Sequence, residues 1–352
     1  MSLRIRLASP SDSEPLLGLY NRNFSDNGDD LGERYHWHNS LNPDGEGWRW
    51  ILYEPSGNPC VGSTCLFPRT VYVDDKEMRV GQVMFFAVDA SHRSLGPAVM
   101  LQRATFDPVN AGELDFCYDC PPHDEGMSTF NRIGMQPNCE MNRYVMLLRS
   151  DEFLAHRLGT GAWTRPIVST ANLLLRSRRF RHAVSGLEVS EFEGTFGDEF
   201  SRLDEFASAS ELIRAKRSAE VLQWRYLQAP MKRLANGERE RFRTYVARRK
   251  GELEGYIVYV AQTDNLVAIH DLFGADLDDV GLPLLEAVVD FSRNNGAYAA
   301  YAYASAESKL ARVLEEAGFR RRERAARVVA YEKMGLRANA LSWAFSQLEL
   351  MR

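Results

Sequence analysis

The chain repeats a pattern at a spacing close to half its length. Trp37 stands six residues before a proline, and so does Trp224, 187 residues further on. A glycine followed by a large apolar residue occurs at Gly134 and again 184 residues later at Gly318. A unit of this length can bury a core of its own. The sequence therefore predicts two copies of one domain within 352 residues.

Each copy contains the same order of predicted elements. A β-hairpin comes first, then a further strand, and then a helix. These segments are 50–53, 60–66, 83–88 and 97–106 in the first copy, and 244–248, 253–259, 266–273 and 282–293 in the second. The expected fold class is mixed α/β, with each domain built on a mostly antiparallel sheet flanked by helices. We expect domains at 1–150 and 187–333, a helical linker at 151–186 and a C-terminal helix at 334–352.

Composition narrows the class of protein. Hydrophobic residues make up 45% of the chain and charged residues 26%, which are the values of a globular protein. The net charge of −5 gives no reason to expect nucleic-acid binding. The five cysteines all lie in the first half, and Cys117 and Cys120 form a pair with no second pair. This predicts a reduced, cytoplasmic protein without a metal site, and no apolar run is long enough to predict a membrane span.

A predicted strand runs through a turn of small residues directly into a helix at Phe85–Leu101. The first N–H groups of a helix have no partner within the helix, so a helix start can bind an anion. Gly96 and Ala98 leave room for a phosphate to approach the backbone. The pattern predicts a pyrophosphate site.

The motif Arg93-x-x-Gly96-x-Ala98 resembles the acyl-CoA loop of the GNAT superfamily of N-acetyltransferases. In the second half, Arg217-Ser218-x3-Leu222-x-Trp224-Arg225-Tyr226-x3-Pro230, followed by the hairpin and His270-Asp271-Leu272, resembles GNAT-like proteins of bacterial polysaccharide biosynthesis. The tandem arrangement resembles the FemAB-type peptidyltransferases. The resemblance implies two tandem GNAT-like domains and acetyl-CoA, or another acyl-CoA, as co-substrate. It assigns Phe86 and Val88 to the pantetheine and thioester. It assigns the pyrophosphate to Arg93, Ser94, Leu95, Gly96, Pro97 and Ala98.

Two positions depart from the family pattern. Gln82 stands where some members have a glutamate base, and Phe130 stands where many have a tyrosine acid. Neither side chain can transfer a proton. The candidates for catalytic proton transfer are therefore His123, Tyr118 and Asp124, which lie on or just after the predicted strand at 114–118.

The second copy lacks the anion-binding motif. Aligning Gly281 with Gly96 places Asp278 at the position of Arg93 and Pro283 at that of Ala98. A carboxylate repels a pyrophosphate and a proline removes an N–H donor. We therefore expect acyl-CoA in the first domain, with the second domain shaping the acceptor site.

Histidines mark two further candidate positions. His270 and Asp271 lie within an apolar strand, where they either bind substrate or form a structural network with Arg225 and Tyr226. His36 and His38 flank Trp37, and an extended segment would turn both toward the same side.

The sequence favours an acyl-CoA-dependent N-acyltransferase, with acetyl as the expected group and a primary amine of a small molecule, such as an amino sugar, as acceptor. A FemAB-like transferase that uses aminoacyl-tRNA is one alternative, although the acidic charge balance opposes it. A non-catalytic CoA-binding protein is another, supported by Gln82 and Phe130. The expected state is a monomer or a homodimer.

Overall fold

The computed structural model describes residues 3–24, 31–55, 60–121, 124–150, 186–207, 213–233 and 239–332. The expected linker helix at 151–186, almost entirely, and the expected C-terminal helix lie outside these residues, as does His123. Among the described helices, none has the length and apolar character needed to cross a membrane.

Both halves contain the elements that the sequence predicted, with additions. The first half contains β1 (Arg4–Leu7), α1 (Ser13–Phe24), α2 (Leu31–Ser40), β2 (Trp48–Tyr53), β3 (Gly62–Val73), β4 (Lys76–Val88), α3 (Leu95–Ala104), α4 (Asp107–Ala111), β5 (Phe116–Asp119), α5 (Asp124–Arg132) and β6 (Cys139–Leu147). The second contains β7 (Leu187–Phe192), α8 (Asp198–Phe206), β8 (Ile213–Ala215), α9 (Ala219–Tyr226), β9 (Arg243–Arg249), β10 (Glu252–Ala261), β11 (Leu266–Gly274), α10 (Leu277–Asn294), β12 (Ala299–Ser305), α11 (Lys309–Glu316) and β13 (Arg320–Glu332).

The strands form one continuous sheet in the order β1-β2-β3-β4-β5-β13-β6-β12-β11-β10-β9-β7, with β8 paired to β3. Only β4–β5 and β11–β12 are parallel among the described pairs. The order within each half is the same, because β7, β9, β10, β11 and β12 correspond to β1 through β5. The mixed, mostly antiparallel sheet flanked by helices is confirmed.

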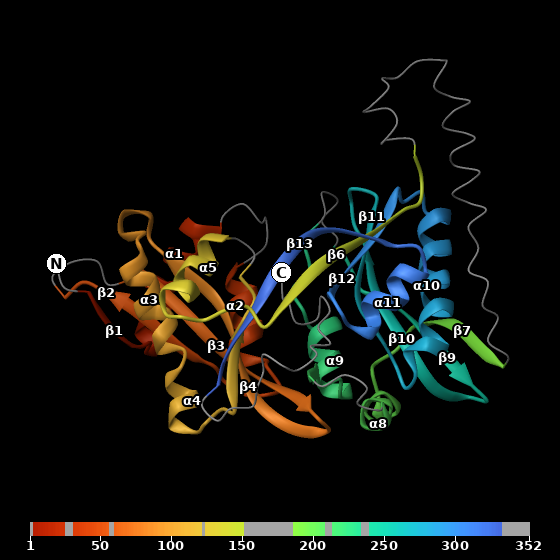
Figure 1. Ribbon diagram of the computed structural model, residues 1–352, viewed down its shortest axis with the longest axis horizontal. Helices are drawn as coiled ribbons and strands as arrows, with labels where there is room; N and C mark the ends of the chain where they lie inside the picture. Colours follow the sequence, from red (N-terminus) through yellow and green to blue (C-terminus); the bar gives the residue numbers. More distant parts are fainter. Residues whose placement is uncertain are drawn as a thin grey trace, which may run out of the picture.

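The two halves exchange their last strands, as Figure 1 shows where β6 and β13 cross the middle of the molecule. β6 is the last strand of the first half in sequence but pairs with β12 of the second. β13 begins beside β6, and its last residues, from Val329 to Glu332, pair with β5 of the first half. Each half therefore completes its sheet with a strand of the other.

Alternation along β3 shows how the first sheet is covered. Cys65 and Phe67 pack in a cluster with Leu16 and Leu19 of α1. Leu66 points the opposite way and packs in a cluster with Ala104 of α3. Since neighbouring side chains of a strand face opposite sides, α1 and α2 cover one face of the sheet and α3 covers the other. In the second half, the corresponding helix α10 packs on β10 and β11.

The two repeated tryptophans contact each other at the centre of the molecule. The rings of Trp37 and Trp224 stack with centroids 4.5 Å apart. Each indole N–H donates to the backbone carbonyl of the other residue, at 3.0 Å and 3.2 Å. A reciprocal contact between equivalent residues places them on a local two-fold axis. The geometry is that expected for two copies of one domain.

Candidate active site

The parallel strands β4 and β5 pair over a short stretch, between the middle of β4 and the beginning of β5. Their register runs from Val80 beside Phe116 to Gln82 beside Tyr118. On its other edge β5 pairs with β13 along its whole length, whereas beyond Gln82 the described residues of β4 pair with β3 alone. The pairing of β4 with β3 shifts at a bulge that contains Phe85, whose φ is 51°. Beyond Gln82, the backbone groups on the β5 side of β4 therefore pair with no described strand.

Helix α3 begins at an exposed corner beyond the end of β4, after the short 3-10 helix η3 (Ala90–His92). Ser94 is its N-cap, and its side chain makes no capping hydrogen bond. In the described part of the chain, the N–H groups of Ser94, Leu95 and Gly96 donate to no protein acceptor. A Cβ atom built on Gly96 would meet nothing within 4 Å. The corner is open to an anion, because no side chain fills it.

The residues predicted to hold the acyl-CoA lie together around this corner. Arg93 is exposed, and its Nη2 donates to Oδ1 of Asn23 on α1 at 2.9 Å. Phe86 is half-buried and Val88 is buried, both on β4. Pro97 is buried, whereas Ser94, Leu95 and Gly96 are exposed.

Gln82 and Tyr118 lie where β4 and β5 separate, on the face covered by α1 and α2. The amide oxygen Oε1 of Gln82 accepts a hydrogen bond from Nε of Arg69 at 3.1 Å. Tyr118 is 3% exposed and packs in a cluster with Val71 and Val80. An arginine therefore occupies the neighbourhood in which family members with a glutamate keep their base.

Asp124 begins α5 and is held by arginines of the exchanged strand. Its Oδ1 accepts hydrogen bonds from Arg327 at 2.5 Å and from Arg324 at 3.3 Å. Its side chain is 79% exposed. These contacts fix α5 to β13, and a catalytic role for Asp124 stays a prediction, as it does for His123 and Tyr118.

A carboxylate that the sequence analysis missed lies on the other face of β5. Asp119 follows Tyr118, so alternation turns it toward the α3 face, beside Cys117. Its partner across the ladder is Val329 of β13, which packs against Phe130 of α5. Burial raises the pKa of Asp119 to about 7. A carboxylate at the end of an apolar strand was the signal that could have identified it.

The second half repeats the strand geometry without the open helix start. β11 pairs with β12 only up to Ile269, and the bulge that follows contains His270. At the start of α10, Nζ of Lys309 pairs with Asp276 at 2.7 Å and with Asp278 at 3.0 Å. These carboxylates occupy the corner that is open in the first half, and they would repel a phosphate.

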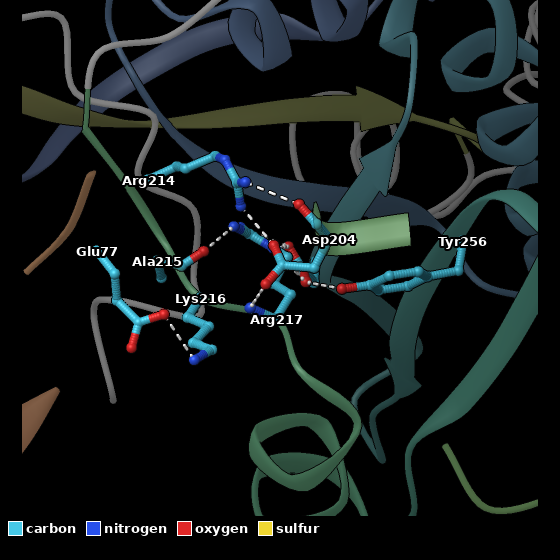
Figure 2. Close-up of polar contacts among 8 residues, drawn as sticks. Glu77, Asp204, Arg214, Ala215, Lys216, Arg217 and Tyr256 are labelled. Carbon is cyan, nitrogen blue, oxygen red and sulfur yellow. Dashed lines mark hydrogen bonds and ion pairs between the residues drawn. The ribbon is translucent and has the colours of Figure 1, made fainter. Parts of the chain in front are cut away.

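Asp271 belongs to a buried ion-pair network, which Figure 2 shows around Arg214 and Arg217. Its Oδ2 accepts from Nε of Arg217 at 3.0 Å and from the hydroxyl of Tyr256 at 2.9 Å. Arg214 pairs with Asp204 of α8 in the same network. The expected pairing of Asp271 with Arg225 and Tyr226 is wrong, because the carboxylate pairs instead with Arg217, just before α9, and with Tyr256.

His270 has different contacts from those of Asp271, the next residue in the chain. Its ring lies edge-on to Phe242, with centroids 4.8 Å apart. Burial, with a contribution from Arg225, lowers the pKa of His270 to about 3, so the imidazole is neutral. Substrate binding by His270 stays a prediction, whereas the contacts of Asp271 are those of a residue that supports the fold.

Replacing Asp271 by alanine is expected to lower the free energy of unfolding by about 3–5 kcal/mol, because it leaves the guanidinium of Arg217 buried without its carboxylate. The two side chains are 5% and 0% exposed. Urea denaturation measures the loss. The matched control is Glu77→Gln, which breaks an exposed pair with Lys216 and should cost about 0–1 kcal/mol. Equal effects of the two substitutions would contradict the assignment.

The prediction that His36 and His38 lie in an extended segment and face the same side is wrong. They lie on the helix α2, where residues two apart point in different directions. His36 is exposed and His38 is fully buried. The interpretation failed because the segment contains few of the apolar repeats that mark a helix.

Three comparisons relate this geometry to known proteins. Residues 4–122 match the family model for the acetyltransferase (GNAT) domain. A search of curated protein sequences finds no match.

Solved structures share the fold over nearly the whole chain. A probable N-acyltransferase from Enterococcus faecalis has 10% identity and a TM-score of 0.63, over 96% of this chain and 74% of that one. A GCN5-related N-acetyltransferase from Anabaena variabilis has 13% identity and a TM-score of 0.63, over 94% and 72%. N-myristoyltransferase from Saccharomyces cerevisiae has 12% identity and a TM-score of 0.58, over 94% and 80%. Residues 4–122 are therefore similar to a GNAT acetyltransferase domain, and the chain as a whole has the fold of these solved N-acyltransferase structures.

Proposed function

We propose that the protein transfers an acyl group from acyl-CoA to a primary amine of a small molecule. The observation that carries the proposal is the open start of α3 at the end of a bulged β4, within the half that matches the GNAT domain. N-myristoyltransferase shares the fold and was solved with bound myristoyl-CoA, which supports an acyl-CoA as co-substrate. Acetyl is the acyl group we infer, since the family model is that of acetyltransferases.

In this proposal the first half holds the CoA. The pyrophosphate accepts hydrogen bonds from the N–H groups of Ser94, Leu95 and Gly96, at the positive end of the α3 dipole. The guanidinium of Arg93 pairs with a phosphate oxygen. The pantetheine follows β4 at Phe86 and Val88, so that the thioester comes to the region where β4 and β5 separate. Backbone N–H groups near the bulge can then stabilise the carbonyl oxygen.

The chemistry requires one proton to leave the amine and one to reach the leaving sulfur. The amine nitrogen attacks the thioester carbon, the C–N bond forms and the C–S bond breaks. We infer that Asp119, protonated in part at neutral pH, gives its proton to the sulfur. The proton released by the nitrogen restores the protonated carboxyl through solvent. Asp119 would thus take the role of the tyrosine acid, whose position is occupied here by Phe130.

One observation favours a second candidate, a CoA-binding protein without catalysis. Gln82 and Phe130 occupy the positions of the usual base and acid, and neither can transfer a proton. Measuring thiol release from acetyl-CoA over a panel of primary amines separates the two candidates. Release that depends on the amine supports the transferase, and CoA binding without release supports the second candidate.

Replacing Arg93 by glutamate is expected to weaken CoA binding about 10- to 100-fold, because the substitution puts a negative charge beside the pyrophosphate. Isothermal titration calorimetry with CoA measures the effect. Arg103→Glu is the matched control, since Arg103 is also exposed but lies at the other end of α3. If the two variants bind CoA equally well, the pyrophosphate site is elsewhere.

A further inference from the structure

Two guanidinium groups stack on the central tryptophan pair, where the halves of the chain meet. Cζ of Arg69 lies 4.9 Å from the ring centre of Trp224, and Cζ of Arg225 lies 5.7 Å from that of Trp37. We use the name arginine–tryptophan cluster for these four residues and His38. The cluster joins β3 and α2 of the first half to α9 of the second.

Arg69 has no acidic partner in the described part of the chain. Its hydrogen bonds go to Oε1 of Gln82 at 3.1 Å, Oδ1 of Asn42 at 3.0 Å, the carbonyl of Pro68 at 2.7 Å and Nδ1 of His38 at 3.4 Å. Asp44 acts on it only at longer range, and its Oδ1 accepts from Thr70. Burial lowers the pKa of Arg69 to about 10, so the group stays charged. A largely desolvated cation without an anion is costly, which makes it a binding group for one.

His38 supplies an unused donor beside Arg69. Its ring is fully buried, and burial together with Arg69 and Arg225 holds its pKa well below the usual range. Because Nδ1 accepts from Nη2 of Arg69, the proton of the neutral ring is on Nε2. Among the described residues Nε2 has no hydrogen-bond partner. A buried donor of this kind indicates a ligand atom that accepts from it.

The cluster lies beside the reaction region. Arg69 holds Gln82, which marks the end of β4–β5 pairing, and Arg69 is half-buried. It lies on the α1 and α2 face of the sheet, because it shares the side of Cys65 and Phe67 along β3. Asp119 is on the opposite face. The acyl donor and the cluster can therefore approach the same point from different sides.

We propose that the arginine–tryptophan cluster binds the acceptor through a carboxylate or phosphate group that the acceptor carries in addition to its amine. The inference rests on the proposed function and names its substrate class. A positive environment also lowers the pKa of a bound ammonium group and so favours the free amine. The cluster then favours the free amine by lowering the pKa of the ammonium group, whereas a glutamate at position 82 would produce the free amine by removing its proton.

The test compares matched amines on the full-length protein. The carboxylate pair is tyrosine and tyramine, and the phosphate pair is phosphoethanolamine and ethanolamine. The thermal unfolding midpoint is titrated with each amine, with and without saturating CoA, in the wild type and in Arg69→Gln. We expect stabilisation by at least one member that carries the carboxylate or phosphate group and by neither member that lacks it, and an apparent affinity about 10- to 100-fold weaker in Arg69→Gln.

Two controls keep the test specific. Arg79→Gln removes an exposed arginine of β4 that stacks on Trp48 at 5.9 Å, and it should leave the stabilisation unchanged. CoA titration of Arg69→Gln shows whether that variant is folded, and Arg69→Lys, which keeps the charge, should retain part of the affinity. The inference would be overturned by stabilisation that is the same with and without the carboxylate or phosphate group, by stabilisation from none of the four amines, or by stabilisation that is unchanged in Arg69→Gln. Failure of the wild type to bind CoA would contradict the proposed function instead.

Discussion

Replacing Asp119 by asparagine is expected to lower kcat for amine-dependent thiol release by about 10²- to 10⁴-fold, the usual contribution of a general acid. The asparagine keeps the shape of the side chain but cannot give a proton to the leaving sulfur. Because burial raises the pKa of Asp119 to about 7, the protonated, active form prevails below pH 7. The wild-type kcat should therefore fall as the pH rises through 7, and this dependence should be absent from the residual activity of the variant.

Stability and a second carboxylate serve as controls for this result. A carboxyl whose pKa is higher in the folded state contributes stability that is lost as the pH rises from about 4 to about 7. Asp119→Asn lacks this loss, so at pH 8 it should unfold at a higher temperature than the wild type. If Asp124→Asn is the variant that loses activity and Asp119→Asn is not, the proton donor is Asp124.

Producing residues 1–150 alone is expected to abolish folding of the first half. Without β13, the buried strand β5 would have a free edge beside Phe116 and Tyr118. Without β12, β6 would expose Met141 and Tyr144, both fully buried in the intact chain. The fragment would present two unpaired apolar edges, which favour aggregation.

Co-expression with residues 187–352 tests the exchange directly. The two fragments should form a soluble 1:1 complex that elutes as one species in gel filtration and unfolds cooperatively. Hydrogen exchange would show protection of β6 and β13 only in that complex. A fragment 1–150 that is monomeric and unfolds cooperatively on its own would show that the exchanged strands are dispensable.

Local patterns in the sequence predicted much of the fold. The hairpins, the strand at 83–88 and the helix after it were predicted because alternation and turn residues act over short distances. The repeat of Trp37 at Trp224 predicted two equivalent domains, and the stacked pair agrees with that expectation. The open corner at Gly96 followed from small residues at a helix start.

What the sequence did not predict depends on contacts between distant segments. The residues around β6 do not indicate that this strand pairs with β12, because the pairing of strands far apart in sequence depends on the packing of the whole sheet. Asp119 looks ordinary in sequence, and its raised pKa arises only from burial in the folded chain. The partner of Asp271 was misassigned because several arginines were possible and proximity in space decides among them.

The contact between Trp37 and Trp224 has the symmetry of a homodimer made from one short polypeptide. Two identical subunits would have to present the same catalytic groups twice. Once joined covalently, the partners are free to diverge. In our proposal the copy with Gly96 keeps the nucleotide, while the copy with Asp278 contributes Arg225 and Trp224 to the acceptor site.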